Sequence, residues 1–248
     1  MFAHNADTAL NSFDDVLKVF KDAKAMLGEI LSSCEFIDAE SIECAKENLQ
    51  IQPPLDDYPC FMLIETSGSD EQHDQEKLTR FLENTMERGL VMDGTLASNS
   101  RETVAMWTLR ESIPEALLRD GYAWLYDVSL PHHKFYESVV DMRQHLSRFG
   151  SGRISRICGF GHLGDGNIHL NVTAPRFDAE LEAAIEPHLF EWTAKNGGSI
   201  SAEHGIGFKK RNLLHLNKTP VALRLMKTLK HAMDPQGILN PYKVLPTE

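Results

Sequence analysis

Apolar positions along the first half of the chain switch repeatedly between helical and extended spacing. Phe13, Val16 and Phe20 recur three and four positions apart, which predicts an amphipathic helix over residues 12–27. Strand-like runs at residues 28–36, 60–68 and 90–98 alternate with helical patterns at residues 38–49, 69–89 and from about Asn99 onward. The last of these helices should end or kink at Pro114, because proline has no backbone N–H to donate.

The second half continues the alternation and ends in a helical segment. Extended patterns cover residues 122–131 and 153–163, and helical ones cover residues 132–149, 178–195 and 220–233. Several strands mix residues suited to one buried and one solvated face, which is typical of antiparallel sheets. We therefore expect an α+β fold, with an antiparallel sheet that carries helices on one side and a C-terminal helical segment.

Charge and cysteine content exclude several classes of protein. Acidic residues outnumber basic ones by 36 to 25, and the basic residues are dispersed, so a nucleic-acid partner is not expected. No apolar run approaches the roughly 20 residues that span a bilayer. The four scattered cysteines are expected to be reduced thiols. No G-x-G-x-x-G in the chain follows a strand and opens a helix, and there is no Walker motif, so a Rossmann or P-loop nucleotide site is not predicted.

A glycine-rich hairpin at residues 161–171 carries the clearest chemical signal. Asp165-Gly166 is typical of a two-residue hairpin turn, and that turn would place His162 directly opposite His169. Directly opposed residues lie about 5 Å apart at Cβ, so the two imidazoles could share one divalent ion. Asn171 would point the same way. A cross-strand polar pair without a metal is the competing interpretation, and a wider turn would change the pairing.

A second candidate lies at residues 199–211, where a short strand-like run ends in Glu203 and His204. A carboxylate added to two histidines makes a site that leaves metal coordination positions open for a substrate. Neighbouring residues on a strand point apart, so one of the two would be a ligand and the other an acid or base. The simpler alternative is that Glu203 is an acid favoured at a helix N-terminus.

Three long motifs resemble the C-terminal part of FAD-linked oxidases of the vanillyl-alcohol oxidase type, and within that family the D-2-hydroxyglutarate dehydrogenases. They are G-H-L-G-D-G-N-I-H-L-N at residues 161–171, S-A-E-H-G-I-G at residues 201–207 and D-P-x-G-I-L-N-P-Y-K at residues 234–243. Shorter matches at residues 27–38, 63–69 and 126–131 extend the resemblance over nearly the whole chain. It implies that residues 1–248 form the substrate- and metal-binding domain, with a ferredoxin-like cap fold, and that the FAD-binding domain is absent.

The resemblance also implies a role for each candidate residue. His162, His169 and Glu203 would bind Zn²⁺, and His204 would be the catalytic base for the hydroxyl proton while FAD accepts the hydride. Asn171, His204 and Arg110 would contact a 2-hydroxyacid substrate, for which the arginine offers a fork that fits a carboxylate. Asn240 and Lys243 match positions that approach the flavin. An electron acceptor such as an electron-transfer flavoprotein and a mitochondrial location are implied in the same way.

Two positions depart from the pattern of hydroxyglutarate-oxidising relatives. Leu125 stands where they usually have a lysine, and Pro114 where some carry a threonine. The loss of a charge for the second carboxylate favours smaller or more apolar 2-hydroxyacids such as D-lactate. A non-catalytic module that binds a metal or a hydroxyacid is the alternative function.

Overall fold

The computed structural model describes residues 2–150 and 152–246, and their centre is a seven-stranded sheet with the strand order β4-β1-β3-β2-β6-β7-β5. Every strand pair in it is antiparallel, which confirms the predicted type of sheet. The strands are β1 (Phe2–Leu10), β2 (Leu31–Asp38), β3 (Cys60–Gly68), β4 (Asp93–Leu96), β5 (Tyr122–Ser129), β6 (Arg156–His162) and β7 (Asn167–Ala174).

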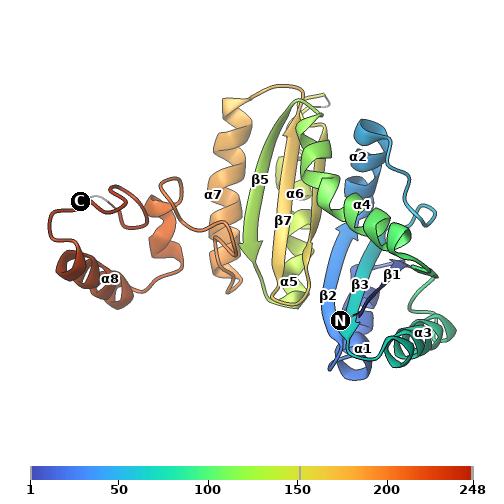
Figure 1. Cartoon of the computed structure of the whole chain (residues 1–248). Helices are drawn as coiled ribbons and strands as arrows, with labels where there is room; N and C mark the ends of the chain where they lie inside the picture. The colour runs from blue at the N-terminus through green and yellow to red at the C-terminus, as the bar shows by residue number, and fades with distance from the viewer. Residues whose placement is uncertain (1, 151, 247–248) are drawn as a thin grey trace.

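Two units of similar topology make up this sheet (Figure 1). The first has the strand order β4-β1-β3-β2, which is that of the ferredoxin-like βαββαβ motif. The second has the corresponding order β5-β7-β6, and after its last helix the chain forms a single antiparallel bridge between Ser199 and Ser129 of β5. The two units join through the pairing of β2 with β6. Because β2 and β6 are paired, residues from both units lie side by side at the candidate site.

The helices lie on both faces of the sheet, with most of them on one. They are α1 (Phe13–Met26), α2 (Ala39–Leu49), α3 (Glu71–Glu87), α4 (Ser100–Leu118), α5 (His132–Phe135), α6 (Glu137–Leu146), α7 (Ala179–Lys195) and α8 (Pro220–Met233), with a 3₁₀ turn at Arg211–Leu216. Buried residues of α1, α3, α6 and α7 share one core cluster with one face of the sheet. The sequence predicted helices on one side only. Helices α2 and α4 instead pack on part of the other face, around Ile37, Phe61 and Phe160.

Two local predictions need correction. β1 was missed, because its polar Asn5 and Asp7 hide the apolar alternation of the opposite face, on which Ala6 and Leu10 are fully buried. Helix α4 begins after Asn99, whose side chain accepts from the N–H of Glu102, and it does not end at Pro114, which was one of the two predicted outcomes. The buried face around Ile113 and Leu117 holds the helix together at the proline.

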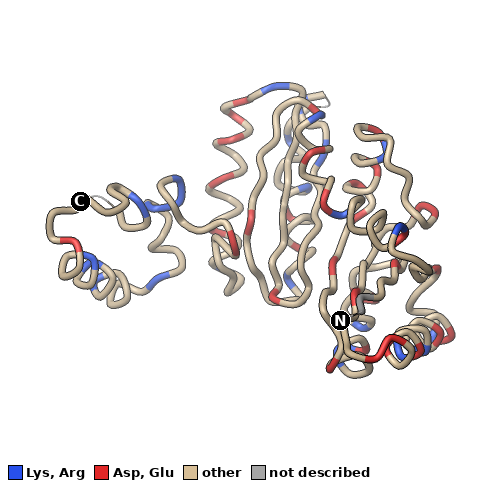
Figure 2. The backbone as a smooth tube through the Cα atoms, in the orientation of Figure 1, with Lys and Arg blue, Asp and Glu red and all other residues tan. Residues whose placement is uncertain are grey.

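The C-terminal residues form a separate arm beside α7 (Figure 1). Helix α8 has no buried residue, and large exposed apolar side chains such as Phe208, Leu225, Leu229 and Tyr242 lie on this arm. Figure 2 shows that basic residues predominate in the arm, whereas acidic residues are frequent on α3 and α7. This arrangement confirms the predicted C-terminal helical segment. Among the described residues, no helix is both long and apolar enough to cross a membrane.

Candidate metal and substrate site

The hairpin between β6 and β7 is wider than the sequence predicted. His162 lies opposite Asn167, and His169 lies opposite Phe160, so four residues rather than two connect the strands. The predicted register is therefore wrong, because Gly161 is directly opposite Ile168 and the turn starts earlier. The shift moves each pairing by two positions, which leaves side chains on their original face. His162 and His169 consequently still share a face, and their ring centroids lie 5.5 Å apart.

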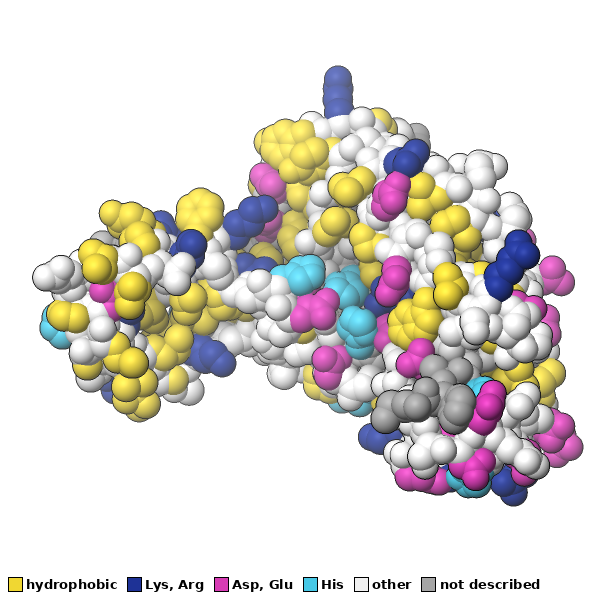
Figure 3. Space-filling view, in the orientation of Figure 1, with side chains coloured by type: hydrophobic (Ala, Val, Ile, Leu, Met, Phe, Trp, Pro, Cys, Tyr) yellow, Lys and Arg dark blue, Asp and Glu magenta, His cyan; other side chains and the backbone are white. Residues whose placement is uncertain are grey.

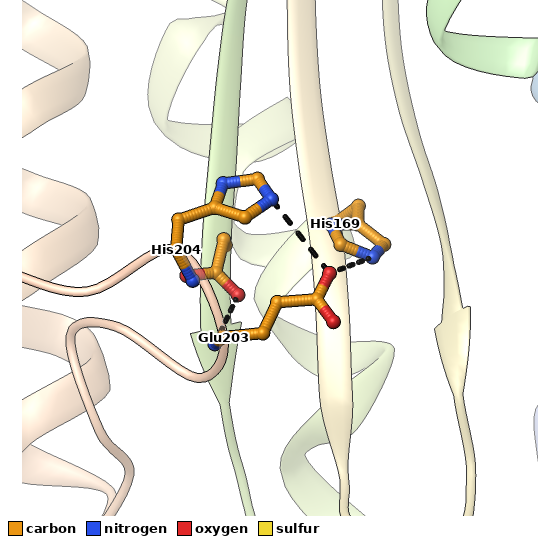
Figure 4. Close-up of side chains that lie close together, drawn as sticks. His169, Glu203 and His204 are labelled. Carbon is orange, nitrogen blue, oxygen red and sulfur yellow. Dashed lines mark hydrogen bonds and ion pairs between the residues drawn. The ribbon is translucent and has the colours of Figure 1, made fainter.

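Glu203 lies close to three imidazoles, of which Figure 4 shows those of His169 and His204. Its carboxylate oxygens lie 3.2 Å from Nε2 of His169, 3.7 Å from Nε2 of His204 and 3.9 Å from Nε2 of His162. Figure 3 shows histidine side chains gathered beside acidic ones in a hollow between the sheet and the C-terminal arm. The structure thus brings together the four residues that the sequence singled out in separate motifs.

The segment that carries Glu203 and His204 is wrapped around the buried side chain of Asp127, which lies on β5 directly opposite His169. The carboxylate of Asp127 accepts hydrogen bonds from the backbone N–H groups of Ala202, Glu203 and His204 at 3.0–3.1 Å, and from Oγ of Ser201 at 3.0 Å. Burial disfavours the charged carboxylate, but these hydrogen bonds outweigh it and lower the pKa of Asp127. The sequence reasoning missed this residue, although an acid inside an apolar strand could have indicated it.

A second buried acid, Glu35, supports the opposite side of the site. Glu35 lies on β2 opposite His162, and its carboxylate is 2.9–3.0 Å from Nδ1 of that histidine. The guanidinium of Arg110 pairs with the same carboxylate at 2.9–3.1 Å and lies over the ring of Phe160. Burial opposes ionisation of Glu35, but the donors of His162 and Arg110 lower its pKa. This acid too was missed.

The two hairpin histidines differ in their electrostatic surroundings. Burial, followed by the positive charge of Arg110 and the neighbouring His162, lowers the pKa of His169 to about 4. The hydrogen bond to Glu35 raises the pKa of His162, against the opposing effect of burial. His169 is therefore neutral at neutral pH, which is the form of imidazole that binds a metal ion.

The donor set fits a divalent metal such as zinc. One ligand atom each from Asp127, His169, Glu203 and His204 lies within 4.8 Å of the others, and His162 reaches the same Glu203 carboxylate. Histidine nitrogen and carboxylate oxygen are the usual ligands of catalytic zinc. Asp127 already accepts four hydrogen bonds, so it is better suited to holding the loop than to binding the ion. Asn167, opposite His162, has a buried amide without a hydrogen-bond partner among the described residues, as expected where a water or ligand completes a site.

The remaining predicted residues divide between the site and the arm. Asn171 is buried beside Leu125 of β5, and its amide donates to the backbone carbonyl of His169. A cavity of about 550 Å³ adjoins His162 and Glu203 on the side of the site that faces α1. Nζ of Lys243 donates to Oδ1 of Asn240 at 3.3 Å on the exposed C-terminal arm, which stands apart from β7 in Figure 1. The described chain therefore does not bring them to the metal site.

Comparison with known proteins identifies the family. The sequence profile of "FAD linked oxidases, C-terminal domain" matches residues 4–244. The chain belongs to the FAD-linked oxidase family. A mitochondrial D-2-hydroxyglutarate dehydrogenase of Rattus norvegicus is 51% identical over 94% of this chain, and a putative mitochondrial D-lactate dehydrogenase of Schizosaccharomyces pombe is 39% identical over 94%. This FAD-linked oxidase chain spans only 43% and 46% of those relatives.

A solved structure supports the fold of this FAD-linked oxidase domain. A p-cresol methylhydroxylase matches with a TM-score of 0.69 at 11% identity, covering 98% of this chain and 52% of the other. At that identity the likeness concerns the fold alone.

Proposed function

We propose that this chain is the substrate- and metal-binding half of an FAD-dependent D-2-hydroxyacid dehydrogenase that oxidises D-2-hydroxyglutarate or a related acid to the 2-oxoacid. The observation that carries the proposal is the convergence of His162, His169 and His204 on Glu203, in a chain of the FAD-linked oxidase family. The name of the rat relative supports hydroxyglutarate as the substrate and the mitochondrion as the location.

In this proposal His162, His169 and Glu203 hold Zn²⁺, and His204 is the base. When bound, zinc supplies a Lewis acid for the substrate oxygens and FAD supplies the hydride acceptor. His204 is exposed and has its Nε2 beside the Glu203 carboxylate, where it can take the proton of the 2-hydroxyl group. Asn171 and the part of the Arg110 guanidinium not used by Glu35 would orient the substrate carboxylates.

We propose that a domain that binds FAD completes this site. The exposed apolar side chains on the C-terminal arm, including Leu225, Leu229 and Tyr242, form the kind of surface that another domain covers. Asn240 and Lys243 lie on that same arm, so we propose that they contact the flavin only when the FAD-binding domain is docked on the arm. An electron-transfer flavoprotein or a similar protein would then reoxidise the flavin.

Zinc binding is the first property to test. The purified chain, stripped with a chelator and reloaded, is expected to hold about one zinc per chain, because the ligand atoms already converge without the flavin half. His162→Ala and Glu203→Ala should each lose most of this zinc. Metal analysis after gel filtration measures it, with His215→Ala, an exposed histidine of the C-terminal arm, as the matched control. Equal zinc in the wild type and both site variants would place the ion elsewhere.

Reconstitution distinguishes the enzyme from a non-catalytic module. Mixing this chain with the FAD-binding half of the rat relative is expected to give dye reduction that depends on substrate, and neither half alone should show it.

Leu125 lies opposite Asn171 with 40% of its surface exposed, so an apolar side chain lines the substrate side of the site. Turnover of D-2-hydroxyglutarate should therefore be compared with that of D-lactate. A stable complex that oxidises neither acid would favour the module.

A further inference from the structure

Glu35 occupies a position that connects the metal site to the substrate arginine. Its side chain is buried between β2, β6 and helix α4, with only 4% of its surface exposed. Both of its oxygens lie within 3.0 Å of Nδ1 of His162, and Oε2 also accepts from Nε and Nη2 of Arg110. Ser33 donates to Oε1 at 2.6 Å. One carboxylate therefore has donors from three directions.

The geometry at His162 gives each ring nitrogen one partner. Nδ1 faces Glu35, whereas Nε2 faces Glu203 on the opposite side of the ring. A neutral imidazole carries one N–H, so donation from Nδ1 to Glu35 leaves the lone pair on Nε2. That lone pair points to the place where the other imidazoles converge. A carboxylate behind a histidine ligand fixes the tautomer and orientation of the ring and makes its other nitrogen a stronger donor.

We propose that Glu35 is a positioning residue that holds the His162 ring with Nε2 toward the metal and, by sharing its carboxylate with Arg110, ties the metal ligand to the substrate-binding arginine. This inference rests on the proposed zinc function. It differs from a purely structural ion pair between β2 and α4, which would stabilise the fold without affecting how His162 binds a metal.

The test is the zinc affinity of Glu35→Gln, measured on the whole chain by competition with a chromophoric chelator. The variant is expected to bind zinc roughly 10–100-fold more weakly than the wild type. In the Co²⁺-loaded protein its visible absorption bands should shift, because the ligand geometry changes. Glu65→Gln is the matched control, since Glu65 lies on the same sheet face one strand away and accepts from Nε1 of Trp107 rather than from a histidine. It should bind zinc as the wild type does.

A double-variant cycle separates positioning from general stability. If Glu35 acts through His162, Glu35→Gln should have little further effect on zinc affinity in a His162→Ala background, whereas a structural effect would add to it. Equal zinc affinity of Glu35→Gln and the wild type, or full additivity, would overturn the inference. A wild-type chain that binds no zinc would instead overturn the proposed function.

Removal of one partner of a buried ion pair can itself unfold the chain, because Arg110 is left without its counter-ion. Arg110→Met combined with Glu35→Gln removes both charges together and avoids that penalty. This double variant should show the same weakened zinc binding, since His162 still lacks its carboxylate. Wild-type zinc affinity in the double variant would also overturn the inference.

Discussion

Replacement of Asp127 by alanine is expected to abolish zinc binding and to destabilise the chain by about 4 kcal/mol. Three backbone N–H groups and the hydroxyl of Ser201 lose their common acceptor. Each buried donor left without a partner costs about 1–3 kcal/mol, and the partial exposure of this loop places each cost at the lower end. Without the carboxylate, Glu203 and His204 keep only their side-chain contacts with His169 of β7, which do not fix the backbone of the loop.

Urea unfolding and metal analysis measure the two consequences separately. Asp127→Asn keeps one oxygen acceptor and the same volume, so its loss of stability should be smaller than that of alanine. Asp56→Ala, an exposed acid of the loop before β3, is the matched control and should change neither quantity. If the Asp127→Ala chain still retained one zinc with unchanged affinity, the loop would not depend on this carboxylate.

Replacement of Asp7 by asparagine is expected to stabilise the chain above neutral pH by about 4 kcal/mol. Burial raises the pKa of Asp7 to about 7, from an ordinary value of 3.8. Between these two pH values the unfolded chain gives up the proton and the folded chain keeps it. Stability therefore falls as pH rises from about 4 to about 7, and the loss is complete above the folded-state pKa. Asparagine has no proton to lose.

Urea unfolding of both proteins at pH 5, 6, 7 and 8 tests this result. The difference in the free energy of unfolding should be less than half as large at pH 5 as at pH 8, and most of its rise should lie between pH 5 and pH 7. Asp56→Asn is the exposed control, for which the difference from the wild type should not follow this course. A constant difference between Asp7→Asn and the wild type across the range would show that Asp7 is ionised in the folded chain.

One face of this sheet carries three buried acids, Asp7, Glu35 and Asp127. All three lie on the face of His162 and His169, each on a different strand. Glu35 and Asp127 have donors that compensate their burial, and both hold a part of the candidate metal site. Burial raises the pKa of Asp7 instead. Acids are seldom buried without such a reason, and their gathering here supports the proposal that this face carries the functional site.

The sequence by itself determined the residue types of the site and the strands that carry them. Alternation in β6 and β7 places His162 and His169 on one face. This prediction holds although the predicted register was wrong by two positions, because the side-chain period of a strand is two. Helix periodicity and caps likewise located α1, α7 and α8 within one or two residues. The family motifs gave Glu203 and His204 as partners of the hairpin.

Only the tertiary structure decided how these parts meet. The contacts of Asp127 with Glu203, and of Glu35 with Arg110 and His162, join residues more than 70 positions apart. Such contacts depend on the strand order and on α4 crossing the site face, which no local pattern encodes. For the same reason β1 was missed: its pairing with β3 and β4 and the burial of Ala6 and Leu10 make it a strand, although its own residues alternate weakly.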